Sequence, residues 1–229
     1  MYKSERVNVI MPVYDEEKTI SEIIKRVLEQ KIVDRLIIVD DGSKDGSLER
    51  IKQAAKADKR ITYFINDKNN GKGFSVRKGL AAVKEGIVII QDADLEYYPD
   101  DYIKLVSKVK DDTAVFGTRI RKRSGHGYRM AKIANDVLTS TFDVLYGRDL
   151  TDINTCYKVF KRKMIRDSEL DKNDFLLDPQ ILVTLVKKGY KIAEVDIRYK
   201  GRSYEEGKRI NAVDGIKQGL FLIKSRFTD

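Results

Sequence analysis

The chain is predicted to fold as a doubly wound α/β protein, and three observations predict this. Short apolar runs alternate with amphipathic segments in a βαβαβ rhythm through the first half of the chain. The runs are continuous rather than alternating, as in parallel strands covered by helices on both faces. Acidic, basic or glycine residues follow four successive runs. Ligands of such sheets bind beyond the carboxyl ends of the strands, so these residues are the first candidates for a site.

The first half is expected to hold four strands, at residues 7–11, 36–39, 61–65 and 87–90. The first helix has apolar residues at the i, i+3, i+4, i+7, i+8 spacing of one buried stripe, namely Ile20, Ile23, Ile24, Val27 and Leu28. A second helix begins near Asp45 and turns Leu48, Ile51 and Ala55 inward. A third covers residues 72–85.

The second half is less regular. Strands are expected at residues 114–117, 156–160 and 192–199, and helices at 129–146, 175–188 and 213–226. The helix at 129–146 carries Met130, Ile133, Ala134, Val137 and Leu138 on one side. No linker or internal repeat interrupts the chain, so we predict a single domain over residues 1–229.

The composition of the chain indicates what kind of partner and which cellular compartment to expect. Apolar residues make up 41% of the 229 residues, enough for a large core, and the net charge of +9 favours anionic partners. Because Cys156 is the only cysteine, no intrachain disulfide is possible, and a reducing cytoplasmic compartment is expected. No signal-peptide layout and no apolar run near the roughly 20 residues of a membrane span is present, so any membrane contact is expected to be peripheral.

Carboxylates follow the fourth predicted strand at Asp92, Asp94 and Glu96. At a strand end the chain can turn so that such side chains reach one cation, and Mg²⁺ or Mn²⁺ prefers oxygen ligands completed by water and phosphate. A polar turn without a ligand is the alternative. No cluster of His or Cys suggests zinc.

Two other strand ends carry charged or glycine residues. The carboxylates of Asp40 and Asp41, which precede Gly42, could accept hydrogen bonds from a nucleobase or ribose, or could cap the next helix. Lys72 lies between Gly71 and Gly73 at a helix start, where backbone N–H groups favour anions. The segment fits neither the Walker loop nor the dinucleotide fingerprint, which disfavours hydride transfer.

Weaker candidates lie in the second half. Arg119 follows a strand directly, and a guanidinium suits bidentate phosphate binding. Asp152 lies between a helix and a strand, and Arg202, Glu206 and Lys208 share one loop; each taken singly is expected to be a solvated surface charge. His126, the only histidine, is expected to be exposed and Cys156 to pack in the core, so nucleophilic catalysis with a histidine base has little support.

Taken together, these motifs resemble family 2 glycosyltransferases. The resemblance is carried by residues 10–16 (IMPVYDE), 38–43 (IVDDGS), 70–73 (NGKG) and 92–94 (DAD) and covers nearly the whole chain. Residues 151–160 (TDINTCYKVF) and 202–215 (RSYEEGKRINAVDG) look like the dolichol-phosphate mannose synthase-like branch, which makes polyprenyl-phosphate sugars.

The resemblance implies a GT-A fold, with a Rossmann-like, mostly parallel sheet flanked by helices, and an inverting transfer from a UDP- or GDP-sugar. Residues 1–118 would form the nucleotide-sugar half and 119–229 the acceptor half. By matching position, the nucleotide-sugar would be held by Pro12, Tyr14, Glu16, Asp40, Asp41, Lys72, Asp92, Arg119, Arg202 and Lys208. Asp92, Asp94 and Glu96 would hold Mg²⁺ or Mn²⁺, with Glu96 where the branch often has Gln.

The acceptor implied by the resemblance is a polyprenyl phosphate. A phosphate acceptor has a second pKa of about 6 and needs little base catalysis, so Asp152, the candidate base, could instead position the acceptor or a cation. Residues 156–158 (CYK) stand where relatives often have Gly-Phe-Arg, which is a departure in the acceptor region. The helices at 129–146 and 213–226 could lie on anionic lipid, or their apolar sides could be core.

Three other functions compete with this interpretation. A transferase acting on a soluble saccharide or protein acceptor would share the donor site. A sugar nucleotidylyltransferase would need a Gly-rich basic loop after the first strand, which is absent. A nucleic-acid-binding module would explain the charge of +9. It would leave the strand-end carboxylates unexplained and lacks a recognisable motif, so no nucleic-acid partner is expected.

Overall fold

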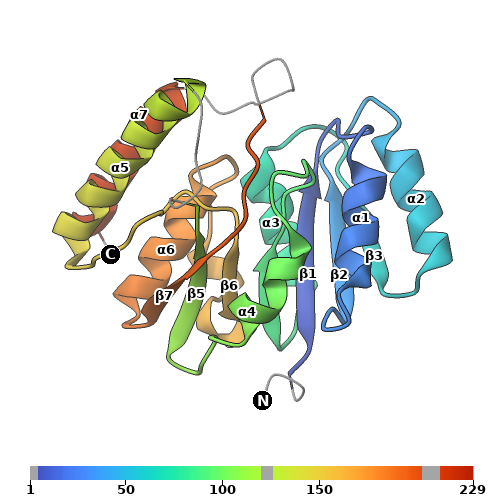
Figure 1. Ribbon diagram of the computed structural model, residues 1–229, viewed down its shortest axis with the longest axis horizontal. Coiled ribbons are helices and arrows are strands. Elements are labelled where there is room, and N and C mark those ends of the chain that lie inside the picture. The colour runs from blue at the N-terminus through green and yellow to red at the C-terminus, as the bar shows by residue number, and fades with distance from the viewer. Residues whose placement is uncertain (1–4, 120–125, 203–211, 229) are drawn as a thin grey trace.

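The computed structural model describes residues 5–119, 126–202 and 212–228. Its centre is one seven-stranded sheet with the order β3-β2-β1-β4-β6-β5-β7 (Figure 1). The strands are β1 (Val7–Val13), β2 (Arg35–Asp40), β3 (Ile61–Ile65), β4 (Ile87–Ile90), β5 (Thr113–Thr118), β6 (Lys158–Lys161) and β7 (Lys191–Asp196). All neighbours are parallel except β6, which is antiparallel to both β4 and β5.

Helices cover both faces of the sheet, which confirms the predicted α/β fold. They are α1 (Ile20–Glu29), α2 (Ser47–Ala57), α3 (Lys72–Ala81), α4 (Tyr102–Val106), α5 (His126–Tyr146), α6 (Leu177–Lys187) and α7 (Ala212–Phe227). The short 3₁₀ helix η1 (Pro99–Asp101) contacts α1, and α3 contacts α6. Further 3₁₀ turns occur at η3 (Arg162–Met164) and η4 (Asp167–Glu169).

The central strands are buried on both faces, as continuous apolar runs require. Every residue of β4 is buried, and so are the four residues from Leu36 to Val39 in β2. The predicted stripe of α1 also packs inward, with Ile20, Ile23, Ile24 and Val27 buried. Cys156 is buried too, as expected for a core residue.

The direction in which successive strands are added to the sheet reverses at β1. From β1 the chain proceeds outward to β2 and β3, and then returns to add β4 on the other side of β1. The carboxyl ends of β1, β2 and β4 therefore meet at a topological switch point, the place where open α/β sheets bind ligands.

Two helices lie at a distance from the central strands. α5 and α7 run side by side beyond α6, at the upper left of Figure 1. The Tyr146 hydroxyl on α5 donates to the carbonyl of Leu222 on α7 at 3.0 Å. Within α5, Phe142 stacks on Tyr146 with ring centres 4.6 Å apart. The two helices thus form one packed unit.

Candidate active site at the carboxyl edge of the sheet

Arg202 gathers three acidic residues at the switch point. Its guanidinium is 3.0 Å from a carboxylate oxygen of Glu16, which follows β1, and 3.0 Å from one of Asp94, which follows β4. Glu96 accepts the backbone N–H of Arg202 at 2.7 Å and the hydroxyl of Tyr199 at 2.8 Å. All four charged side chains are at most one-fifth exposed. The structure therefore brings four of the predicted site residues together.

The carboxyl group of Asp94 is held in an unusual environment. Burial, together with the negative charges of Asp92 and Glu96, raises the pKa of Asp94 to about 7, although Arg202 opposes this rise. Burial alone would lower the pKa of Arg202, but the hydrogen bonds that its guanidinium donates to Glu16 and the negative charges of Asp94 and Glu96 outweigh burial and raise it. Buried carboxylates with a perturbed pKa are frequent at functional sites.

Lys72 forms ion pairs with Asp92 and with Asp178, which is also paired with a buried lysine. Its ammonium is 2.8 Å from Asp92 and 3.4 Å from Asp178, the second residue of α6. Asp178 also accepts a hydrogen bond from Lys158 at 2.9 Å, and the side chain of Lys158 is fully buried in β6. The two lysines hold the pKa of Asp178 below its usual value, even though burial alone would raise it.

Two carboxylates at the end of β2 differ in their hydrogen bonds: one has an oxygen with no donor, and the other is fully used to hold a loop. Asp40 is buried and accepts the N–H of Ser43 with one oxygen, while its other oxygen is buried without a hydrogen-bond partner. Such an oxygen is costly unless a donor reaches it, which suits a ligand. Asp41 instead accepts from the amide of Asn66 at 2.7 Å and from the N–H of Gly71 at 2.8 Å, so it fastens the following loop.

The glycines beside Lys72 allow close packing of two loops. A Cβ on Gly71 would lie 2.3 Å from the carbonyl oxygen of Asn173, and one on Gly73 would lie 2.6 Å from that of Lys172. Phe74 donates its N–H to the Asn173 carbonyl at 3.0 Å. Two N–H groups at the start of α3, those of Gly71 and Phe74, are thus bound within the chain.

Arg119 and Asp152 form a bidentate pair beside the strand edge. The guanidinium donates to the two oxygens of Asp152 at 2.6 and 2.7 Å and to the hydroxyl of Tyr97 at 3.1 Å. Asp152 is buried, and its own N–H donates to Glu194 at 3.0 Å. The sequence-based expectation of solvated charges for these residues is wrong, because Asp152 is buried and Arg119 is one-ninth exposed at most.

Two of the carboxylates predicted to bind a metal ion are instead paired with basic side chains. Asp92 is paired with Lys72, and Asp94 with Arg202. In the described part of the chain no group of three acidic, His or Cys side chains is arranged to hold a metal ion. The donors still fit Mg²⁺ or Mn²⁺ in kind, since they are hard oxygens at a buried edge. A metal ion bound here would replace Arg202 or Lys72 as the partner of these carboxylates.

The remaining predicted residues divide into two groups. Pro12 lies in β1 and Tyr14 follows that strand, and both are partly buried at the same edge. Lys208 and Glu206 lie outside the described residues.

Several residues that shape the site were not expected from the sequence, notably Tyr97, Asp178, Tyr199 and Glu194. A signal for one of these residues, Asp178, was present in the sequence: Lys158 interrupts the apolar run 156–160, and a lysine in a buried strand requires a counter-charge. The sequence does not say that the partner is Asp178, because the two residues meet only when α6 packs on the sheet.

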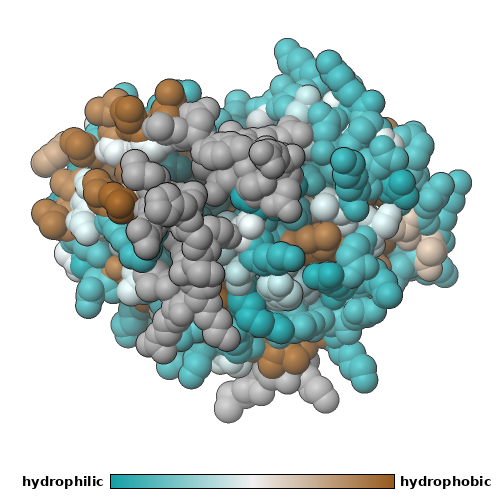
Figure 2. Space-filling view, turned by 45° about the horizontal axis from the view of Figure 1, so that its top comes forward, coloured by the Kyte–Doolittle hydropathy of each residue, from teal (hydrophilic) through white to brown (hydrophobic). Residues whose placement is uncertain are grey.

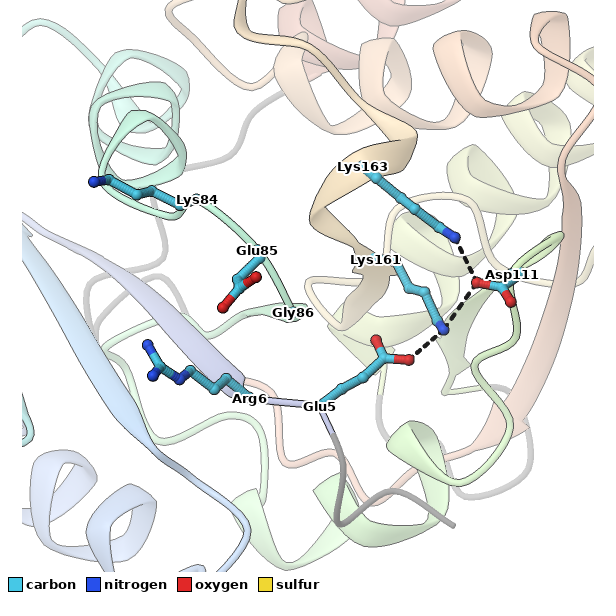
Figure 3. A pocket seen from close by; sticks show the side chains of 8 residues that line it. All are labelled: Glu5, Arg6, Lys84, Glu85, Gly86, Asp111, Lys161 and Lys163. Carbon is cyan, nitrogen blue, oxygen red and sulfur yellow. Dashed lines mark hydrogen bonds and ion pairs between the residues drawn. The ribbon is translucent and has the colours of Figure 1, made fainter.

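A pocket lies at the opposite, amino edge of β4 (Figure 3). Its volume is about 390 Å³, and its side chains pair with each other: Lys161 with Glu5, and both Lys161 and Lys163 with Asp111 at 3.1 and 2.6 Å. None of the predicted site residues lines it. The carboxyl edge is therefore the better candidate for chemistry.

The fold and the acidic strand ends define a transferase with the GT-A fold. The chain matches the model of glycosyl transferase family 2 over residues 8–168, and it belongs to that family. It is a glycosyltransferase, as the sequence motifs predicted.

Curated relatives extend over most of the chain. An uncharacterized protein of Methanocaldococcus jannaschii is 32% identical over 88% of this chain and 93% of its own length. The undecaprenyl-phosphate 4-deoxy-4-formamido-L-arabinose transferase of Proteus mirabilis is 28% identical, and glycosyltransferase AglJ of Haloferax volcanii is 26% identical. The chain spans 63% of the Proteus protein and 68% of AglJ.

Solved structures share the fold at low identity. Glucosyl-3-phosphoglycerate synthase of Mycobacterium tuberculosis, solved with Mg²⁺ and UDP, superposes with a TM-score of 0.73 at 19% identity, over 98% of this chain and 80% of that one. The same enzyme was solved with Mn²⁺, UDP-glucose and phosphoglyceric acid, at a TM-score of 0.71 and 18% identity.

Proposed function

We propose that this glycosyltransferase moves a hexose from a UDP- or GDP-sugar to a polyprenyl phosphate, with inversion and with Mg²⁺ or Mn²⁺. The observation that carries the proposal is the meeting of Glu16, Asp94 and Glu96 around Arg202 beside the Lys72–Asp92 pair. A site of alternating negative and positive groups suits a diphosphate together with a divalent cation.

Each charged group has a role in donor binding. The unpartnered oxygen of Asp40 would accept a hydrogen bond from the base or ribose. Asp92, Asp94 and Glu96 would hold the cation, which would neutralise charge on the leaving diphosphate. Arg202 and Lys72, released from their carboxylates, would then face phosphate oxygens, since a guanidinium and an ammonium both bind phosphate well.

The reaction proposed is a single displacement. A phosphate oxygen of the acceptor forms a bond to the anomeric carbon as the bond from that carbon to the nucleoside diphosphate breaks. The acceptor phosphate is largely a dianion at neutral pH and carries no proton that must be removed. Asp152, held by Arg119, would then orient this guanidinium rather than act as a base.

A soluble phosphate-bearing acceptor is the second candidate. Glucosyl-3-phosphoglycerate synthase, which shares the fold, was solved with phosphoglyceric acid, a soluble acceptor type. The names of the undecaprenyl-phosphate transferases favour the lipid acceptor instead. Both acceptors present a phosphate or carboxylate, so the donor site does not separate them.

The donor site is tested by calorimetric titration of UDP and GDP with and without Mn²⁺. We expect metal-dependent binding of one nucleotide, lost in Asp94→Ala and retained in Asp111→Ala, which changes an exposed carboxylate at the other edge. A folded protein that binds neither nucleotide would contradict the proposal.

The acceptor and stereochemistry need a second measurement. With the donor identified, undecaprenyl phosphate and phosphoglycerate are compared as acceptors, and the anomeric configuration of the product is read by NMR. Product on undecaprenyl phosphate with inverted configuration supports the proposal. Turnover with phosphoglycerate alone would contradict the lipid acceptor and would favour a soluble acceptor.

A further inference from the structure

Exposed apolar side chains are concentrated on α5 and α7. Among the described residues, eleven large hydrophobic side chains are exposed, and eight of them lie on these two helices. They are Ile133, Val137, Val144, Val213, Ile216, Leu220, Ile223 and Phe227. Figure 2 shows brown side chains gathered at the upper left, the end that carries α5 and α7. Apolar patches of this kind mark interaction sites.

The patch is the outer face of a helix pair whose inner face is already buried. On α7, residues 213, 216, 220, 223 and 227 follow the spacing of one helical stripe, while Gln218 and Leu222 on the other side are buried. On α5, Ile133, Val137 and Val144 line up at i, i+4, i+11, while Leu138 and Phe142 pack inward. The core therefore does not account for the outer stripes.

Basic residues flank the apolar stripe of α7. Lys217 and Lys224 are exposed, and each follows a stripe residue by one position, which places it about 100° around the helix at the edge of the stripe. Arg226 is exposed as well and donates to the carbonyl of Leu145 at 2.7 Å, at the junction with α5. The only acidic residue of α7 is Asp214, against these three bases.

We propose that the α5–α7 face docks on the surface of an anionic lipid bilayer. Ile, Leu and Phe of an amphipathic helix enter the boundary between headgroups and acyl chains, and flanking lysines remain among anionic headgroups. A second copy of the chain is a poorer occupant, because its identical basic flank and the net charge of +9 would oppose association. In the described parts of the chain no helix is long and apolar enough to cross a membrane.

The helix α5 leads along the chain to the candidate site. The chain runs from the end of α5 through Thr151 into Asp152, which pairs with Arg119 at the carboxyl edge of the sheet. A bilayer against α5 and α7 thus lies beside the half of the molecule assigned to the acceptor. The binding itself needs no turnover, so it can be tested even if the proposed function fails.

The test is flotation of the purified protein with vesicles of phosphatidylcholine and phosphatidylglycerol at low salt. We expect binding to mixed vesicles, weak binding to phosphatidylcholine alone, and release by high salt. Ile216→Ser/Leu220→Ser should lower the partition coefficient at least about tenfold, because it removes apolar contact from the stripe. Lys217→Glu/Lys224→Glu should lower it on anionic vesicles by a similar factor.

The control is Ile65→Ser/Ile103→Ser, which removes two exposed apolar side chains from β3 and α4; they are 44% and 48% exposed, against 65% and 63% for Ile216 and Leu220. It should bind vesicles as the unchanged protein does, and thermal unfolding confirms that each variant is folded. No binding to anionic vesicles, or equal loss in the control, would overturn the proposal. So would a dimer in analytical ultracentrifugation that Ile216→Ser/Leu220→Ser dissociates, because the face would then join two copies.

Discussion

The buried charges of this protein form ion pairs that connect the core to the candidate site. Lys158 is fully buried, and its ammonium is 2.9 Å from Asp178, which in turn lies 3.4 Å from Lys72. Lys72 reaches Asp92, so a line of four alternating charges runs from the core to the candidate site. Because each member compensates its neighbours, removing one leaves a buried charge without a partner.

Asp178→Asn is therefore expected to destabilise the protein. Loss of the counter-charge should lower the free energy of unfolding by about 3 kcal/mol or more, because Lys158 stays buried. Denaturant unfolding followed by circular dichroism measures this. Asp112→Asn removes an exposed pair with Lys191 and should change little. If both variants behave alike, the chain of charges does not stabilise the core.

Asp152→Asn separates a positioning role from a base role. An asparagine still accepts one hydrogen bond from Arg119, so we expect kcat to fall about tenfold or less, with an unchanged pH profile. A general base is worth about 10²–10⁴-fold in rate. A loss in that range, together with loss of the limb of the pH profile, would make Asp152 a base. Thermal unfolding of the variant serves as the control for folding.

At the scale of elements, loops from distant parts of the chain lock the site. Gly71 has φ of +98°, and the loop 172–174 packs directly on it. Gly71→Ala should lower the free energy of unfolding by about 2 kcal/mol more than Gly189→Ala. Both glycines have positive φ, but a Cβ at Gly189 meets nothing within 4 Å. Denaturant unfolding of both variants checks this, and equal losses would show that the contact with Asn173 carries no energy.

The elements also show what the sequence could predict. The strand 87–90 has the predicted bounds, and β1 runs two residues past the prediction, through Pro12. Proline was expected to stop the strand, but Pro12 lies beyond Ile10, the last residue that β4 pairs with. The helix α4 was not predicted, because five residues are too few for a periodic pattern.

The helix at 129–146 shows a limit of periodicity. Ile133, Val137 and Leu138 were expected on one side, yet Leu138 is buried while Ile133 and Val137 are 56% and 59% exposed. Two adjacent stripes on a helix cannot be separated by spacing alone, and only packing decides which one faces the core. The acids at strand ends were predictable because parallel strands end at one edge, whereas their partners Tyr97, Tyr199 and Asp178 depend on tertiary packing.

At the scale of the whole molecule, the two halves share one sheet. β6 comes from the second half but lies between β4 and β5, and β7 pairs with β5 along its whole length. Glu96 and Tyr199, from different halves, are joined by a hydrogen bond of 2.8 Å. Neither half can therefore separate without exposing the apolar faces of strands that belong to the other.

This arrangement predicts a single cooperative unfolding transition. Differential scanning calorimetry should give one peak whose calorimetric enthalpy equals the van't Hoff enthalpy, because the continuous sheet couples residues 1–118 to residues 119–229. A nucleotide and a divalent cation that bind the native site should move the whole peak to higher temperature rather than split it. Two resolved peaks, with only one displaced by the ligand, would show that the halves unfold as independent domains and that β6 does not bind them into one unit.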